Sequence, residues 1–293
     1  MYKPLRHVIV KHPRDAFLSQ KNLNKEWKVF HYIEEPDYDE AFNEYEEFIA
    51  ILKKHVQVIE YLPPSSEVGI DSLYSHDPVK FTKEGAIVLK SGKALRQPEA
   101  KVYREFLKMK KIPILGELTG DAVADGGDIL WLDDRTLAVG LGYRTNEEAI
   151  RQLREMTKHL VDEFIVVPLP HDRGEDECLH LMSIISIVDQ DLAVVHSRLM
   201  PVFFRKILIE RGFQLIEVPE EEYHQLGCNV LALAPRVCVM VSGNEITKKQ
   251  LLAAGAKVHE YKGKEISYKG TGGPTCLTCP VVRDESGGGM KVV

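Results

Sequence analysis

The hydrophobic pattern between residues 128 and 169 changes from short apolar runs to helical spacing and back. Ile150, Leu153 and Met156 fall on one face of a predicted helix, and Thr145 is a candidate for its N-cap. The short apolar runs before and after this helix are typical of buried strands. The pattern therefore predicts two strands, a helix and a third strand, at residues 128–132, 136–140, 147–158 and 164–168.

The same order of elements recurs along the chain, at a period of roughly 45 residues. Three further copies are predicted at residues 79–115, 182–218 and 229–261, with helices at 98–110, 201–211 and 247–254. The remaining copy must combine both ends of the chain. It takes one strand from residues 279–283 and its other elements from residues 7–10, 38–54 and 56–61. The sequence thus predicts five strand-strand-helix-strand modules.

A module assembled from both termini favours a closed ring, because an open solenoid has no reason to bring its ends together. No linker rich in Pro, Ser or Gly divides the chain. We therefore expect one α/β domain over residues 1–293. Residues 285–293, which contain three consecutive glycines, are expected to be a loosely held tail.

The composition excludes several classes of function. A net charge of −6 without any basic run argues against nucleic acid as a partner. No segment reaches about 18 consecutive apolar residues, and the first residues lack the apolar core of a signal peptide, so we expect no membrane association. Five unevenly spaced cysteines argue against a disulfide framework and favour a reducing, cytoplasmic setting. The acidic stretch 34–47 is expected to be a solvated helix face.

The strongest chemical signal lies in residues 270–280, Gly-Thr-Gly-Gly-Pro-Thr-Cys-Leu-Thr-Cys-Pro. Cys276 follows a glycine-rich turn, where its side chain has room to reach a ligand. With Cys279 it forms a C-x-x-C, which leaves open a redox pair, half of a zinc site or two core cysteines. No second metal-ligand pair completes a zinc site, and a strand follows where a redox motif normally begins a helix. A nucleophilic thiol is favoured, and it requires a proton-accepting neighbour.

His180 and Asp125 supply an imidazole and a carboxylate for such a thiol. Each has an ordinary explanation by itself, as a buried histidine and as the first residue of an Asp-Gly-Gly-Asp turn. Together with the Gly-Gly-Pro-Thr-Cys segment, they resemble the guanidino-group-modifying superfamily of arginine deiminases, dimethylarginine dimethylaminohydrolases and amidinotransferases. The resemblance covers residues 5 to 284 and implies a pseudo-fivefold α/β propeller, the pentein fold, in agreement with the five predicted modules.

The resemblance also implies roles for individual residues. Cys276 matches the nucleophile, His180 the catalytic histidine, and Asp125 the carboxylate that orients this histidine. Asp77 matches the carboxylate that holds the substrate guanidinium. Asp71 resembles a further substrate-contacting aspartate of the dimethylarginine branch.

Two arginines match the pair that grips the α-carboxylate of the substrate in this superfamily. They are Arg96 and Arg144, and their planar guanidinium groups suit a carboxylate. Met182 stands where arginine deiminases have a further aspartate on the guanidinium, and dimethylarginine hydrolases also lack that aspartate. Met182 at this position favours the dimethylarginine branch or a distinct substrate specificity.

The resemblance implies a cytoplasmic hydrolase, without cofactor or metal, that cleaves a guanidino C–N bond of arginine or of an Nω-substituted arginine. The products are citrulline and ammonia or an alkylamine. An amidinotransferase, in which an amine replaces water, stays open, as does a thiol redox or metal-binding protein that uses Cys276 and Cys279. The expected partner is a small guanidino compound, and a homo-oligomer stays open.

Overall fold

The computed structural model describes residues 1–175 and 177–284, and fifteen strands lie in these ranges. They are β1 (Leu5–Val10), β2 (Val58–Tyr61), β3 (Val79–Phe81), β4 (Ala86–Val88), β5 (Ile114–Glu117), β6 (Ile129–Trp131), β7 (Thr136–Leu141), β8 (Glu163–Pro168), β9 (Ile185–Asp189), β10 (Leu192–Val195), β11 (Gln214–Glu217), β12 (Leu231–Ala234), β13 (Val237–Val241), β14 (Lys257–Tyr261) and β15 (Cys279–Arg283).

The α-helices of these ranges include five longer ones that connect strands and four short ones. The longer helices are α3 (Tyr38–Leu52), α4 (Glu99–Met109), α5 (Glu147–Thr157), α7 (Val202–Glu210) and α9 (Glu245–Ala253). The short ones are α1 (Pro13–Ala16), α2 (Gln20–Glu26), α6 (Leu181–Ile184) and α8 (Glu220–Tyr223). None of the helices in the described ranges is both long enough and apolar enough to cross a membrane.

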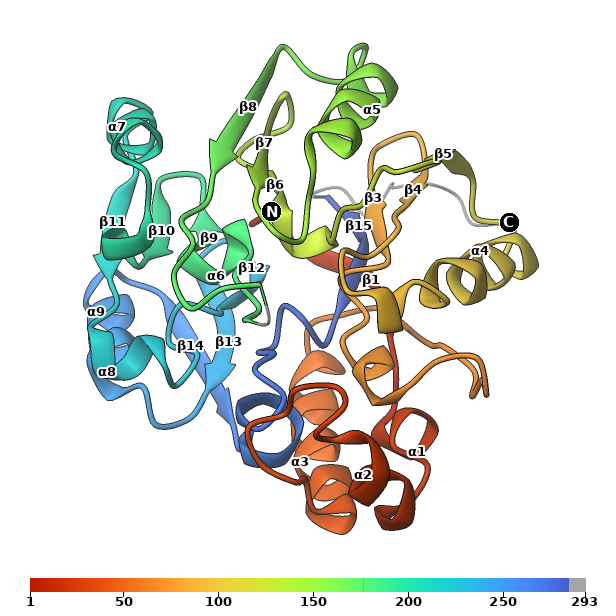
Figure 1. The fold of residues 1–293 in the computed structure, drawn as a ribbon. Helices are drawn as coiled ribbons and strands as arrows, with labels where there is room; N and C mark the ends of the chain where they lie inside the picture. The colour runs from red at the N-terminus through yellow and green to blue at the C-terminus, as the bar shows by residue number, and fades with distance from the viewer. Residues whose placement is uncertain (176, 285–293) are drawn as a thin grey trace.

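The strands form five three-stranded sheets arranged around a common centre (Figure 1). The sheets have the orders β15-β1-β2, β3-β4-β5, β6-β7-β8, β9-β10-β11 and β12-β13-β14. In each sheet the first two strands pair antiparallel and the last two pair parallel. A parallel pair needs a crossover connection, which one of the five longer helices provides in every module. The predicted pseudo-fivefold α/β propeller is confirmed.

The two ends of the chain meet in one sheet and close the ring. Strand β15 pairs antiparallel with β1, and in this register Ile9 lies opposite Cys279 and Leu5 opposite Arg283. Strand β2 then adds parallel to β1. The module that combines both termini is therefore present as predicted.

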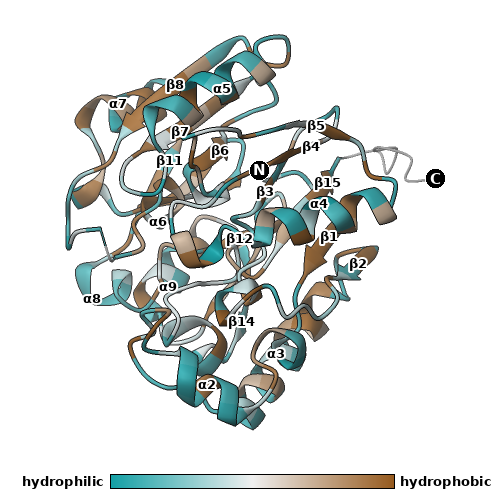
Figure 2. Ribbon diagram, turned by 45° about the vertical axis from the view of Figure 1, so that its right-hand side comes forward, coloured by the Kyte–Doolittle hydropathy of each residue, from teal (hydrophilic) through white to brown (hydrophobic). Residues whose placement is uncertain are grey.

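Each module buries the apolar side of its helix against its own sheet. In α5, Ile150 and Leu153 are buried among side chains of β4, β6 and β7. Burial of such a side chain contributes about 1.5–3 kcal/mol relative to exposure. Figure 2 shows the result, with strands that are mostly hydrophobic and helices that carry hydrophilic residues on their outer sides.

Two local predictions are wrong. Residues 182–187 do not begin as a strand, because α6 occupies Leu181–Ile184 before β9 starts. The His180 N–H donates to the Ser183 hydroxyl at 3.0 Å, and this contact favours a helical turn over a strand. The N-cap of α5 is Asn146, whose side chain accepts from the Ala149 N–H at 2.9 Å. The neighbouring Thr145 has a different partner, described below.

The acidic stretch 34–47 is only partly the solvated face that its composition suggested. Glu44 is buried, and its carboxylate accepts backbone N–H groups at Lys264 and Glu265, at 3.1 and 2.7 Å. These belong to the single π-helical turn Lys264–Tyr268, whose first N–H groups need acceptors. The predicted tail, residues 285–293, lies outside the described residues.

Candidate active site

The Asp125–Asp128 turn packs so closely against its neighbours that only glycine fits at its two central positions. A Cβ atom on Gly126 would lie 2.2 Å from the carbonyl oxygen of His76. A Cβ atom on Gly127 would lie 2.4 Å from Nδ1 of His180. The two glycines therefore let the turn approach both the His76–Asp77 backbone and the His180 ring.

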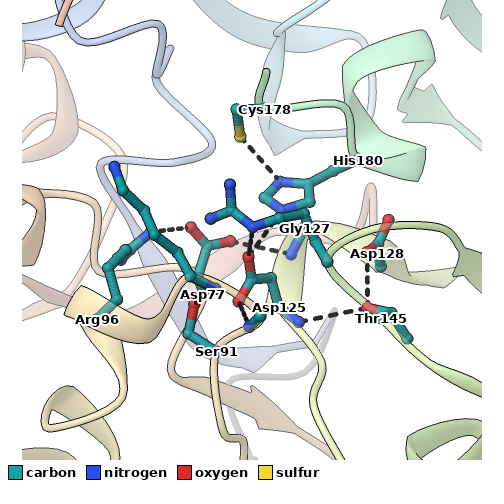
Figure 3. A network of polar contacts seen from close by, with 12 residues as sticks. Asp77, Ser91, Arg96, Asp125, Gly127, Asp128, Thr145, Cys178 and His180 are labelled. Carbon is teal, nitrogen blue, oxygen red and sulfur yellow. Dashed lines mark hydrogen bonds and ion pairs between the residues drawn. The ribbon is translucent and has the colours of Figure 1, made fainter. Parts of the chain in front are cut away.

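His180 lies between Asp125 and Cys178 in the buried polar network of Figure 3. Its Nε2 is 3.0 Å from the Asp125 carboxylate, and its Nδ1 is 3.6 Å from the Cys178 sulfur. Burial alone would lower the pKa of His180, but Cys178 and Asp125 raise it well above its usual value. Both ring nitrogens then carry a proton and donate, so the imidazolium form is favoured.

Arg144 shares the Asp125 carboxylate with His180. Its Nε lies 2.8 Å from the same Asp125 oxygen that faces the histidine. Burial would raise the pKa of Asp125, yet Arg144 and His180 hold it well below its usual range. Asp125 is therefore ionised and can keep His180 charged.

Asp77 also faces a guanidinium, that of Arg96. Its Oδ2 lies 2.5 Å from Arg96, and its Oδ1 accepts the Gly127 N–H at 3.1 Å. The Arg96 fork also donates twice to Glu99, at 2.9 Å each, so both arginine and acid are buried and paired. Asp77 is thus a buried carboxylate that contacts both Arg96 and the Asp125–Asp128 turn.

Asp71 lies next to the same region but is held by a lysine. Lys93 donates to the Asp71 carboxylate at 2.6 Å and to the Phe30 carbonyl at 2.7 Å. Asp71 is buried, and the side chain of Lys93 is mostly buried. The lysine was not among the residues predicted from the sequence.

Cys276 is partly buried and has Asn229 as its hydrogen-bond partner. The Asn229 amide donates to the Cys276 sulfur at 3.3 Å, and its carbonyl accepts the Thr275 N–H at 3.0 Å. Burial and the negative charge of Asp77 raise the pKa of the Cys276 thiol to about 12. The neutral thiol is therefore the favoured form near neutral pH.

The seven predicted site residues divide into four contact groups. The first three groups are Asp125 with His180 and Arg144, Asp77 with Arg96, and Asp71 with Lys93. In the described ranges the Cys276 side chain has Asn229 and none of these groups as its hydrogen-bond partner, but the charges of Asp77 and His180 act on its thiol. The residues therefore gather in one region, and their chemical roles stay predictions.

A cavity of about 270 Å³ opens beside this network. Its lining includes Arg144 and Lys93, and also His31, Gly92, Ala94, Tyr143 and Glu175. Arg96 does not line it. The two predicted carboxylate-binding arginines therefore differ in position, since Arg144 reaches this opening and Arg96 lies behind Asp77.

Asp128 supports the site from behind the turn. It accepts the Thr145 hydroxyl at 2.6 Å and the Leu181 N–H at 2.8 Å. Burial raises the pKa of Asp128 to about 6. The contact to Leu181 fixes the backbone next to His180, and the Thr145 hydroxyl in turn holds the Asp128 carboxylate in place.

Sequence reasoning missed four residues of this region: Lys93, Asn229, Thr145 as a partner of Asp128, and Cys178 as a neighbour of His180. For Cys178 a signal was available, because it lies two residues before the histidine. Lys93 lies 22 positions after its partner Asp71, and Asn229 lies 47 positions before its partner Cys276, and no spacing rule connects either pair.

Comparison with known proteins agrees with this fold. The sequence profile of the arginine deiminase family matches residues 54–204 and 200–283, so the chain belongs to the arginine deiminase family. The chain is 28% identical to the uncharacterized protein YkgA of Bacillus subtilis, over 84% of this chain and 81% of that protein. It is also 28% identical to the arginine deiminase of Limosilactobacillus reuteri, over 55% of this chain but only 47% of that enzyme.

Two solved structures share the fold over nearly the whole chain. One is a cysteine-to-serine variant of the dimethylarginine dimethylaminohydrolase of Pseudomonas aeruginosa, complexed with citrulline. It is 22% identical, has a TM-score of 0.75, and matches 94% of this chain and 99% of that one. The other is the N-terminal domain of ArgZ, covalently bound to a reaction intermediate, at 18% identity and a TM-score of 0.80, matching 94% of this chain and 98% of that one.

Proposed function

We propose that this protein hydrolyses a guanidino C–N bond of arginine or an Nω-substituted arginine through a covalent intermediate on Cys276. The observation that carries the proposal is the arrangement of Asp77, Asp125 and His180 around one buried turn, with the charges of Asp77 and His180 acting on the Cys276 thiol. Membership of the arginine deiminase family supports the reaction class. The products are citrulline and ammonia or an alkylamine.

Asp77 is the proposed anchor for the substrate guanidinium. A carboxylate has about four lone-pair positions, and Arg96 and the Gly127 N–H use two of them. A second guanidinium can therefore bind the same group, and bidentate geometry would orient its central carbon toward the thiol.

The arriving cation would also activate the thiol. A positive charge beside Cys276 offsets the effect of Asp77 and lowers the thiol pKa from its raised value. The thiolate then adds to the guanidinium carbon and forms a C–S bond. Proton loss from Cys276 is thus coupled to substrate binding.

His180 is the proposed acid and base. As an imidazolium it donates a proton to the departing nitrogen while the C–N bond breaks, which leaves a thiouronium on Cys276. The neutral imidazole then takes a proton from water, and the hydroxide attacks the thiouronium carbon. The C–S bond breaks, the proton of the added hydroxyl passes to the departing sulfur, and the ureido product and the neutral Cys276 thiol are released.

The α-carboxylate of the substrate is assigned to the cationic opening lined by Arg144 and Lys93. Each of these side chains also pairs with an acidic residue of the network, Arg144 with Asp125 and Lys93 with Asp71, so the opening adjoins the proposed guanidinium site. Arg96 is proposed to help to position Asp77 and to contribute less directly to carboxylate binding.

The test is incubation with arginine, monomethylarginine, dimethylarginine or agmatine, each with and without glycine, followed by mass spectrometry. Citrulline formed without glycine supports the hydrolase, and the Cys276→Ser variant provides the background. A new guanidino compound formed only with glycine would replace the hydrolase by an amidinotransferase. A lack of any turnover with all four compounds would contradict the proposal.

A further inference from the structure

A second cavity, of about 410 Å³, lies between β3, β6 and β15. These three strands come together beside the N-terminus in Figure 1. Much of the wall is apolar and includes Val79, Phe81, Trp131 and Val281. This cavity shares no lining residue with the opening beside Arg144.

Lys80 is a buried cation in the wall of this cavity. Its ammonium has two uncharged partners at 3.3 Å, the His76 Nε2 and the Gly126 carbonyl. The Nδ1 of His76 lies 2.8 Å from the Thr278 carbonyl, so Nδ1 carries the proton and Nε2 accepts from Lys80. Within residues 1–175 and 177–284, no carboxylate lies at ion-pair distance from Lys80. Burial lowers the pKa of Lys80 to about 8, as expected of an ammonium without a counter-charge.

Arg283 is a second cation in the wall with an unused donor. One of its terminal nitrogens donates to the Lys3 carbonyl at 2.8 Å. Its Nε is buried and has no hydrogen-bond partner in the part of the chain that the structure describes. Burial lowers the pKa of Arg283 to about 9. An unsatisfied donor of a charged group is costly, so this guanidinium is only partly paired within the described residues.

The acidic residues of the wall already have partners. Asp133 lies 2.9 Å from Arg211, Asp134 lies 2.5 Å from Lys3, and Asp284 lies 3.8 Å from Arg6. The side chains of Asp133 and Asp134 are 43% and 50% exposed, so they lie at the rim. The side chain of Asp284 is 20% exposed and pairs with Arg6, whereas Lys80 is 6% exposed and pairs with no carboxylate of the described residues. The uncompensated charge inside the cavity is therefore positive.

We propose that this cavity binds a small organic anion, a carboxylate on a short apolar chain. The carboxylate would accept hydrogen bonds from Lys80 and Arg283, and the chain would cover Trp131 and the neighbouring apolar wall. The volume falls within the range of small-molecule sites, and a mostly apolar lining with a few placed polar groups is their usual character. Cys276 does not line this cavity, and anion binding here does not require the chemistry proposed for that thiol.

The chain carries a built-in reporter, because one of its two tryptophans, Trp131, lines the cavity. A Trp27→Phe variant leaves Trp131 as the remaining tryptophan. We expect hexanoate to change its fluorescence saturably at constant ionic strength. Acetate has the charge without the chain and hexanol has the chain without the charge, so both should bind at least about tenfold more weakly. Hexanol as strong as hexanoate, or no response to hexanoate, would overturn the proposal.

Two further variants, made in the Trp27→Phe protein, test where the anion binds. Lys80→Met and Arg283→Met should each weaken hexanoate binding by about tenfold or more, since each removes a charge-assisted contact. Lys158→Met, on the surface outside this cavity, should not change it. If Lys80→Met does not fold by circular dichroism, the Arg283→Met variant decides the result. An unchanged hexanoate affinity in a folded Arg283→Met protein would contradict the proposed site.

Discussion

The Nδ1 of His180 lies 3.6 Å from the sulfur of Cys178, while the sulfur of Cys276 accepts a hydrogen bond from the Asn229 amide. The two thiols therefore have different electrostatic surroundings. Burial opposes ionisation of Cys178, but His180 and Arg144 lower its pKa below the usual value. Burial raises the pKa of Cys276 to about 12. His180 therefore favours ionisation of the Cys178 thiol more than that of Cys276.

The first prediction concerns alkylation without substrate. Iodoacetamide should modify Cys178 faster than Cys276, because the thiolate is the attacking form and Cys178 has the lower pKa. Brief exposure followed by peptide mass spectrometry gives the two rates. Cys238, which is buried and whose pKa burial raises to about 12, should stay unmodified and serves as the control. Faster labelling of Cys276 would show that its thiol is activated before substrate arrives.

Turnover should depend on the Cys276 thiol and not on the Cys178 thiol. Cys276→Ser should lose at least ~10³-fold in kcat, since a hydroxyl at neutral pH is a far poorer nucleophile. Cys279→Ser is the matched control from the same C-x-x-C, and it should keep most of the activity because its sulfur is buried in β15. Cys178→Ser should stay within about tenfold of the unmodified enzyme. An inactive Cys178→Ser with an active Cys276→Ser would reverse the assignment of the nucleophile.

A third prediction follows from the carboxylate beside His180. Asp125 favours the protonated histidine, so Asp125→Asn should lower the pKa of His180. The acid form then disappears at a lower pH, and the basic limb of the kcat profile should shift toward lower pH, with a loss of ~10²–10⁴-fold near neutrality. Asp121→Asn, at an exposed aspartate just before the turn, should leave the profile unchanged. A lower rate with an unshifted basic limb would indicate that Asp125 only supports the fold.

Closure of the ring predicts an unusual response to truncation. Removal of residues 279–293 deletes β15, and with it the pairing to β1 and the buried Cys279 and Val281. The protein should then lose its cooperative thermal transition in circular dichroism. Removal of residues 285–293 alone is the control and should change Tm little, as is usual for a terminal segment. Cooperative unfolding at an unchanged Tm without β15 would contradict a closed ring as the basis of stability.

The repeated pattern of strands and helix was sufficient to predict the ring, because every module buries its helix and sheet by the same periodicities. The pairing of β1 with β15 followed from counting modules. The polar contacts of the site could not be predicted in the same way. Arg96 was assigned to a substrate carboxylate, but it lies between Asp77 and Glu99, which approach it from different parts of one module. Similarly, nothing in the order of residues indicates that Asn229 reaches Cys276 across 47 positions.

The last prediction separates the roles of the two arginines through agmatine, which has a guanidinium but no α-carboxylate. If Arg144 and Lys93 bind that carboxylate, agmatine should fall behind the preferred arginine-type substrate by at least ~10²-fold in kcat/KM, since the site loses a charge-assisted contact and keeps unpaired donors. Arg144→Ala should lower the ratio of kcat/KM for the arginine-type substrate to kcat/KM for agmatine.

The ratio is the required readout for this variant, because Arg144 also contacts Asp125 and its loss should slow both substrates. Arg173→Ala, on an exposed arginine of the neighbouring loop, is the matched control and should keep the ratio. Arg96→Ala should lower both rates through Asp77 and leave the ratio nearly unchanged, since Arg96 does not line the opening. If instead Arg96→Ala abolishes the preference over agmatine and Arg144→Ala keeps it, the α-carboxylate of the substrate binds to Arg96.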